Sequence, residues 1–206
     1  MIRNIAFDFG GVIIRLSQSE AIRRFGSLGL ADAHRQLDAY TQTGIFGAIE
    51  RGEISAEEFR LRLGTLCGRT LSADECRWAW LGYNGGIAPG ALDTLQELRR
   101  QGFRVIILSN TNPYMMSWAM SDAFSPDHRP LSDYADAVYL SYQCHAMKPD
   151  ERFFRAMLSG EGILPGETLF LDDGPRNIQA AEQLGIHGWL IADDTPWTQD
   201  IWKRIP

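Results

Sequence analysis

The stretch IRNIAFDFGG, residues 2–11, decides how the N-terminal part of the chain folds. Its mostly apolar run Ile2–Phe7 has the length of a strand, and Asp8 followed by a Phe-Gly-Gly turn ends it. A run without regular polar alternation is typical of a strand covered by helices on both faces of a parallel sheet. The stretch therefore predicts a buried first strand with a carboxylate at its carboxyl end.

Four more short apolar runs follow along the chain: Val105–Leu108, Ala137–Leu140, Thr168–Leu171 and Trp189–Ala192. Between them lie segments with apolar residues at helical spacing, such as Leu92, Leu95 and Leu98 before Gly102. Strands that alternate with helices predict an α/β fold with a doubly wound parallel sheet. Ligands of such sheets bind beyond the carboxyl ends of the strands. Asp193 and Asp194, which follow the last run, are interpreted as a turn.

Residues 15–87 interrupt this alternation and are helical in pattern. Ser55 with Glu58, and Ser72 with Glu75, match the capping box that starts a helix. Glycines and a proline at 85–90 predict a hinge back to the sheet. The expected organisation is a core of residues 1–14 and 88–206 with a small helical domain, 15–87, inserted between them.

Composition limits the classes of function. The chain has 206 residues and a net charge of −6, which disfavours nucleic acid and anionic membrane surfaces as partners. No apolar run approaches the roughly 20 residues of a membrane helix. Cys67, Cys76 and Cys144 are odd in number and widely spaced, which favours reduced thiols and a cytoplasmic protein.

Polar side chains gather where the predicted strands end: Asp8, Ser109, Asn110, Lys148, Asp172 and Asp173. In a parallel sheet these ends converge on one crevice, and carboxylates that converge away from water need a cation or protons. A set of oxygen ligands suits Mg²⁺, which commonly shares a substrate phosphate. The ion and Lys148 would supply the positive charge that an anionic substrate needs.

Four motifs in this order resemble those of the haloacid dehalogenase-like (HAD) hydrolase superfamily: FDFGGV at 7–12, LSNT at 108–111, KPD at 148–150 and LDDGPRN at 171–177. Residues 15–87 lie where that superfamily inserts a helical cap over its Rossmann-like core. The resemblance implies a phosphatase in which Asp8 attacks phosphorus and forms an aspartyl-phosphate that water hydrolyses. The expected partner is a small phosphorylated metabolite, and the expected assembly is a monomer or a homodimer.

The resemblance also implies a role for each site residue. Mg²⁺ would be held by Asp8, the carbonyl of Gly10 and Asp173, with Asp172 bound directly or through water. Ser109, Asn110 and Lys148 would bind phosphate oxygens, and Asp8, Ser109 and Lys148 form the expected catalytic set. Asn177 would orient the acidic pair. Arg15, Thr43 and Gly44, in or near the insertion, are further candidates for substrate contact.

Gly10 departs from the usual pattern, because most phosphatases of this superfamily carry a general acid–base aspartate at that position. General acid–base help is worth about 10²–10⁴-fold. The Asp-aromatic-Gly-Gly pattern resembles a subgroup that includes active sugar-phosphate phosphatases, so a water or a residue of the insertion is expected to supply the proton. Three alternatives stay open: a 2-haloacid dehalogenase, a phosphate-binding regulatory protein with little turnover, and a phosphomutase.

Overall fold

The core of the protein is a five-stranded parallel sheet. The computed structural model describes residues 1–37, 43–192 and 195–205, so the turn expected at Asp193 and Asp194 lies outside the described residues. The strands are β1 (Asn4–Phe7), β4 (Arg104–Ser109), β5 (Ala137–Leu140), β6 (Thr168–Asp172) and β7 (His187–Leu190), in the order β5-β4-β1-β6-β7. All five predicted strands form, and the last begins two residues before the predicted Trp189.

The strand order places a topological switch at β1. After β1 the chain adds β4 and β5 on one side of it, and then β6 and β7 on the other. Phe7 is level with Ile107 of β4 and with Leu171 of β6. The residues that follow these three partners therefore emerge side by side at the carboxyl edge, where doubly wound sheets bind ligands.

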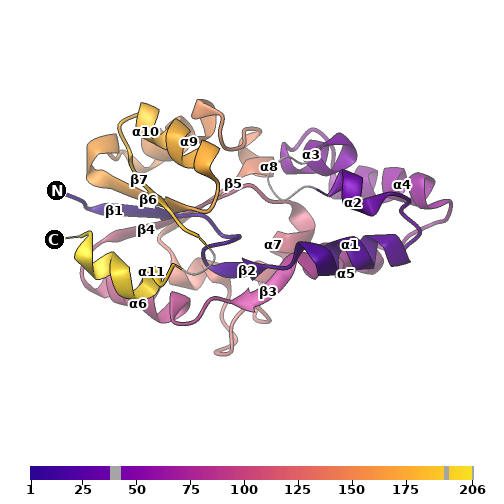
Figure 1. Cartoon of the computed structure of the whole chain (residues 1–206), viewed down its shortest axis with the longest axis horizontal. Helices are drawn as coiled ribbons and strands as arrows, with labels where there is room; N and C mark the ends of the chain where they lie inside the picture. Colours follow the sequence, from indigo (N-terminus) through magenta and orange to yellow (C-terminus); the bar gives the residue numbers. More distant parts are fainter. Residues whose placement is uncertain (38–42, 193–194, 206) are drawn as a thin grey trace.

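Helices cover both faces of the sheet (Figure 1). α9 (Glu151–Glu161) and α10 (Pro175–Gln183) lie on one face, and α6 (Ala91–Arg100) and α11 (Trp197–Asp200) on the other. Successive residues of β1 serve opposite faces: Ile5 and Phe7 join one buried apolar cluster, whereas Ala6 joins the second. Burial on both sides explains why β1, β4 and β6 are mostly apolar.

A separate group of helices, the helical lobe (residues 18–83), extends beyond the carboxyl edge of the sheet (Figure 1). It contains α1 (Gln18–Ser27), α2 (Ala33–Gln36), α3 (Gly44–Glu50), α4 (Ala56–Cys67), α5 (Ala73–Trp80) and the 3-10 turn η1 (Leu81–Tyr83). Phe25, Phe46, Phe59 and Trp80 form its centre, with neighbouring ring centroids 5.2–5.6 Å apart. Aromatic rings at such spacing gain edge-to-face contacts in addition to burial.

Both predicted helix starts are present in the lobe. Ser72 and Glu75 form the complete reciprocal box, since Glu75 N donates to Ser72 Oγ and Ser72 N to Glu75 Oε2. At the other start Glu58 N donates to Ser55 Oγ, but the Glu58 carboxylate pairs with Arg62 instead of closing the box.

The connection between the lobe and the sheet differs from the expected glycine hinge. β2 (Ile14–Leu16) and β3 (Asn84–Ile87) form a two-stranded antiparallel sheet that joins the entering and leaving chain segments. Gly85 lies in β3, opposite β2. A side chain at this position would not fit, because a Cβ there would lie 2.9 Å from the carbonyl oxygen of Arg15. Close approach of two backbones therefore explains a glycine that the sequence suggested was a hinge residue.

The remaining elements are α7 (Pro113–Ala119), α8 (Ser141–Cys144) and the 3-10 turns η2 (Leu131–Tyr134), η3 (Pro165–Glu167) and η4 (Ile201–Lys203). α7 lies between the sheet and the lobe (Figure 1). The three cysteines are unpaired. Among the described residues, no helix has both the length and the apolar character needed to cross a membrane.

Candidate active site

Asp8 lies at the carboxyl end of the central strand. Asp8 N donates to Leu171 O at 2.8 Å, which continues the pairing with β6 by one residue. The Oδ1 atom of Asp8 accepts the backbone N–H of Phe9 at 2.7 Å and is 2.9 Å from Lys148 Nζ. Neither contact uses Oδ2. The carboxylate is therefore held by one oxygen while the other is left for chemistry.

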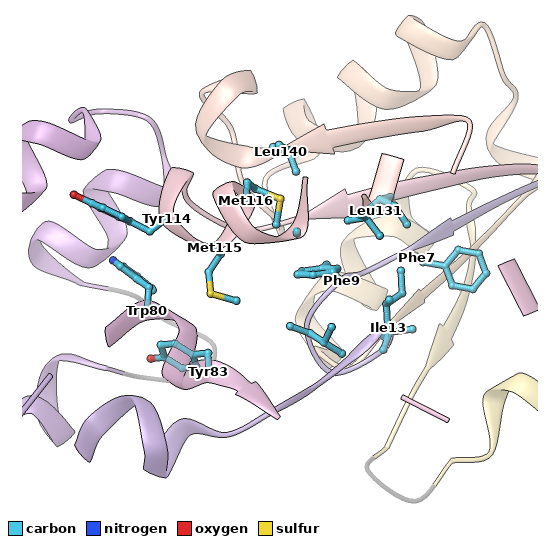
Figure 2. Close-up of a cluster of buried hydrophobic side chains, with 14 of the residues drawn as sticks. Phe7, Phe9, Ile13, Trp80, Tyr83, Tyr114, Met115, Met116, Leu131 and Leu140 are labelled. Carbon is cyan, nitrogen blue, oxygen red and sulfur yellow. The ribbon is translucent and has the colours of Figure 1, made fainter. Parts of the chain in front are cut away.

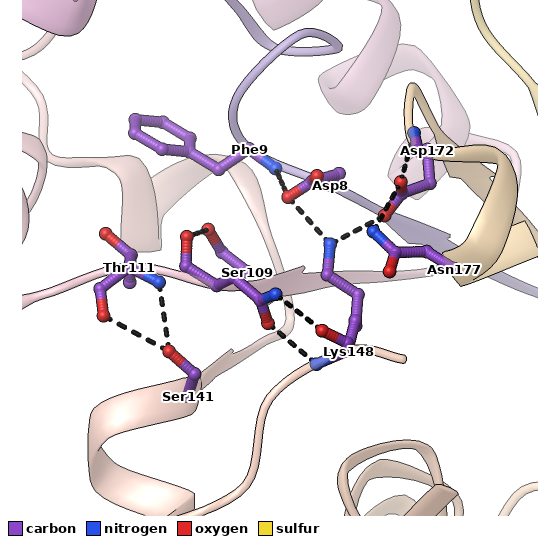
Figure 3. Close-up of polar contacts among 10 residues, drawn as sticks. Asp8, Phe9, Ser109, Thr111, Ser141, Lys148, Asp172 and Asn177 are labelled. Atoms are coloured by element: carbon purple, nitrogen blue, oxygen red, sulfur yellow. Dashed lines mark hydrogen bonds and ion pairs between the residues drawn. The ribbon is translucent and has the colours of Figure 1, made fainter. Parts of the chain in front are cut away.

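Lys148 bridges two strand ends (Figure 3). Its Nζ lies 2.7 Å from Asp172 Oδ2 and 2.9 Å from Asp8 Oδ1, and the residue is only 2% exposed. Burial by itself lowers the pKa of Lys148, but the carboxylates of Asp172 and Asp8 outweigh burial and raise it. Burial raises the pKa of Asp8 well above its ordinary value, and Lys148 opposes that rise. The lysine is thus kept as a cation.

The two aspartates at the end of β6, Asp172 in the strand and Asp173 just after it, have different surroundings. Asp172 is fully buried, and its Oδ1 accepts the Gly174 N–H at 2.7 Å and the Asn177 Nδ2–H at 2.9 Å. Asp173 is half-buried beside Gly11, where a Cβ would lie 2.2 Å from its carboxylate. Gly11 also has a φ of +75°, so this turn admits only glycine without rearrangement.

The end of β4 is fixed by side-chain contacts to the backbone (Figure 3). Asn110 Nδ2 donates to the carbonyl of Lys148, and the Lys148 N–H donates to Asn110 Oδ1, at 2.9 and 2.8 Å. The Ser141 hydroxyl similarly joins the N–H and carbonyl of Thr111. The amide of Asn110 therefore positions Lys148, a contact that its predicted phosphate-binding role did not anticipate.

The strand ends open into a cavity of about 590 Å³ between the sheet and the helical lobe. Its floor includes Asp8, Gly10, Asn110, Lys148, Asp173 and Asn177. Its roof, defined here as the residues that the lobe contributes, consists of Glu50, Arg51, Trp80 and Tyr83. Met115 lies between floor and roof, with Trp80 and Tyr83 on one side and Phe9 on the other (Figure 2). The volume suits a small metabolite.

Glu50 is the feature of the roof that the sequence did not indicate. It ends α3 and is 7% exposed, and burial raises its pKa to about 7 while Asn112 and Arg51 oppose the rise. In the sequence it stands in the polar stretch ERGE, where a glutamate ordinarily faces solvent. Only the packing of α3 against α4 and α8 reveals its position.

The structure brings the predicted site residues to one place. Ser109 and Asp172 lie beneath the cavity floor, nearly or fully buried, and the other predicted residues line the cavity. Arg15, Thr43 and Gly44 are exposed and are not among the described residues that line it. Strand β2 directs Ile14 and Leu16, rather than Arg15, toward the cavity. Contact of one of the three candidates with the substrate stays a prediction.

A family model for haloacid dehalogenase-like hydrolases matches residues 2–185, most of the chain. The chain belongs to the haloacid dehalogenase-like hydrolase family. Its Rossmann-type sheet and the four motifs at the strand ends are the features shared with that family.

Individual HAD relatives extend this comparison. The chain is 46% identical over 201 residues to a D-ribitol-5-phosphate phosphatase of Bacteroides thetaiotaomicron, covering 98% of this chain and 97% of the relative. A predicted HAD-like family hydrolase from Porphyromonas gingivalis superposes with a TM-score of 0.93 at 41% identity, over 99% and 98% of the two chains. A HAD family enzyme of B. thetaiotaomicron, crystallised with magnesium and inorganic phosphate, has a TM-score of 0.91 at 31% identity, over 98% and 99%.

Proposed function

We propose that this HAD hydrolase is a Mg²⁺-dependent phosphatase of small phosphorylated polyols or sugars, with Asp8 as nucleophile. The observation that carries the proposal is the Asp8 carboxylate at the switch-point strand, anchored through Oδ1 by Lys148 and Phe9 with Oδ2 left over. The name of the 46% identical relative, a D-ribitol-5-phosphate phosphatase, supports the substrate class.

The donor set fits Mg²⁺. Carboxylate oxygens of Asp8, Asp172 and Asp173 lie within 4.8 Å of one another, and Lys148 is the ammonium that pairs with two of them. Three carboxylates that converge beside one ammonium offer the oxygen ligands that a divalent ion such as Mg²⁺ prefers. Asp8, Asp173 and the Gly10 carbonyl would hold the ion. Asp172 would bind it directly or through a water molecule. When bound, it would neutralise phosphate charge.

The chain's own residues would perform the remaining tasks. Asp8 Oδ2 attacks phosphorus, while Lys148 attracts the phosphate oxygens and holds Asp8 in orientation. Ser109 at the end of β4 would donate to the phosphate, and Asn110 would contribute there while its side chain positions Lys148. Asn177 and the Gly174 N–H keep Asp172 directed at Lys148. Such positioning and charge compensation carry most of the rate of phosphoryl transfer.

The helical lobe, within residues 15–87, would act as a cap over the core formed by 1–14 and 88–206. Its roof residues limit the cavity to small molecules and exclude water from the reacting phosphate. Three unpaired cysteines are consistent with a reducing cytoplasm, and the expected assembly is a monomer or a homodimer. No observation favours the dehalogenase, binding-protein or phosphomutase alternatives.

The test is a screen of polyol and sugar phosphates that includes D-ribitol 5-phosphate, with Mg²⁺ or with a chelator, on wild type and Asp8→Asn. We expect Mg²⁺-dependent phosphate release that the variant reduces by about 10⁴-fold or more, because removing a nucleophile leaves only binding and electrostatic help. Thermal shift of wild type by Mg²⁺ alone measures ion binding independently of turnover. Phosphate release from no compound, or equal release by Asp8→Asn, would refute the proposal.

A further inference from the structure

Among the described residues, the floor of the cavity offers no carboxyl group besides Asp8 and Asp173, which the proposed function assigns to attack and metal binding. Gly10, two residues after Asp8, offers only its backbone. Its φ is not in the left-handed region, and a Cβ there would meet nothing closer than a terminal methyl of Leu16 at 3.1 Å. The backbone therefore does not require glycine at this position, and the missing acid is not a steric consequence of the turn.

The roof places a carboxyl group in the same cavity. Glu50 lies at the last position of α3, is more than nine-tenths buried and lines the cavity together with Asp8 and Lys148. Among the described residues it forms no ion pair, whereas the next glutamate, Glu53, is exposed and pairs with Arg51. A buried acid without a cationic partner is costly, so its position calls for a reason other than stability.

Asn112 provides a second, independent sign of function at this place. It is 1% exposed and starts α7, where its Oδ1 accepts the N–H groups of Tyr114 and Met115. This cap fixes the amide plane, and the Nδ2 atom finds no hydrogen-bond partner among the described residues although it is buried. Asn112 lies close enough to Glu50 to favour the ionised carboxylate. Asn112 and Glu50 therefore interact with each other where both line the cavity.

We propose that Glu50 is the general acid and base of this phosphatase, replacing from the helical lobe the side chain that Gly10 lacks. This inference rests on the proposed function. Asn112 is a positioning residue that favours the ionised form of Glu50 after the proton has left.

The proton balance of the reaction closes with this assignment. Asp8 Oδ2 forms a bond to phosphorus, the bond from phosphorus to the leaving oxygen breaks with its electron pair on that oxygen, and the Glu50 proton goes to it. The products are the alcohol, the aspartyl-phosphate and an ionised Glu50. Water then attacks phosphorus and gives one proton to Glu50, while the bond to Asp8 breaks and restores its carboxylate.

The surroundings of Glu50 suit both steps near neutral pH. Burial raises its pKa to about 7, so both protonation states are accessible there. The groups that act on it are Arg51 at the end of its own helix and the neutral Asn112 of α7. α8 also packs against α3, and the His145 that follows α8 lies next to Gly52. The helical lobe therefore provides an acid of suitable strength without a second carboxylate beside Asp8.

The experiment compares Glu50→Gln with wild type on two substrates, using rapid quench to follow the first turnover. D-Ribitol 5-phosphate has a poor leaving group that needs a proton, whereas p-nitrophenyl phosphate does not. We expect kcat for D-ribitol 5-phosphate to fall about 10²-fold or more. With p-nitrophenyl phosphate we expect a rapid burst of one p-nitrophenolate per enzyme and then slow turnover, because attack by Asp8 survives but the water lacks a base. Glu58→Gln, an exposed glutamate of α4, is the matched control and should behave as wild type.

Other results would contradict the inference. Unchanged turnover of p-nitrophenyl phosphate, with only D-ribitol 5-phosphate slowed, would mean that Glu50 binds substrate hydroxyls. Equal losses on both substrates without a burst would mean a structural role. In either case Asp8-dependent phosphate release by wild type would leave the proposed function standing, whereas its absence would overturn the function itself.

Discussion

The floor and the roof of the cavity hold carboxylates under different conditions. On the floor, Asp8 and Asp172 share a buried ammonium, Lys148, at 2.9 and 2.7 Å. On the roof, Glu50 is buried without an ion pair among the described residues, and burial raises its pKa to about 7. A carboxylate beside a cation stays ionised, which suits attack and metal binding on the floor. A carboxyl group that is buried without an ion pair has a raised pKa, which suits proton transfer from the roof.

The largest loss of stability is expected from Lys148→Met, which removes the cation that accompanies the two floor carboxylates. Asp8 and Asp172 would then be buried without compensation, and breaking a buried pair costs about 3–5 kcal/mol. We expect the free energy of unfolding at pH 8, measured by urea denaturation in chelator, to fall by that amount. Adding Asp8→Asn should restore part of it, because one uncompensated charge disappears. A loss below about 1 kcal/mol would show that the floor carboxylates do not depend on the lysine.

Glu50→Gln should alter how stability depends on pH. The pKa of Glu50 is raised from 4.5 to about 7 on folding, so the folded state keeps a proton that the unfolded chain loses. The contribution of Glu50 to the free energy of unfolding is fully present below pH 4.5. As the pH rises from 4.5 through 7, the free energy of unfolding of wild type falls by about 3 kcal/mol because of this group. The variant has no such titration, so its stability relative to wild type should rise across this window in urea denaturation. A constant difference, with Glu58→Gln as control, would contradict the burial of an acid in the roof.

The smallest effect is expected from Tyr114→Phe, which removes a hydrogen bond between α7 and the helical lobe. The Tyr114 hydroxyl donates to the Ala56 carbonyl at 2.7 Å, joining α7 to the start of α4. Loss of one such bond costs about 1 kcal/mol. We expect faster hydrogen exchange in the first turn of α4 with little change in the sheet. Tyr139→Phe, which removes a hydroxyl bound to Glu161 in the core, should leave that turn unchanged. Equal exchange in both variants would mean that the contact does not hold the lobe.

Much of the core could be predicted because local sequence specifies it. The run Ala137–Leu140 is apolar throughout, and the observed strand has the same bounds. The small sheet of β2 and β3 was missed because both strands are short, β3 contains two glycines, and the strands pair over a long sequence separation. The last strand was displaced by two residues because His187 and Gly188 carry no apolar signal.

The residues of the site also differ in whether the sequence could place them. Asp8, Lys148 and Asp172 could be placed together from the sequence, because parallel strands bring their carboxyl ends to one edge whatever the details of packing. The amide of Asn110 is used on the Lys148 backbone, and that contact depends on the exact approach of two loops. Glu50 could not be found from sequence, because its charge pattern is that of an exposed helix end.

The sequence by itself therefore determined the acidic strand ends, the order of the elements and the absence of a side chain at Gly10. Tertiary structure alone decided what replaces that side chain, since α3 and α7 are joined by no local signal and approach only when the lobe packs over the sheet edge. The physical reason is that strand ends converge through backbone hydrogen bonding, which local pattern encodes. Burial of a single carboxyl, and with it the pKa of Glu50, depends on which distant surfaces meet.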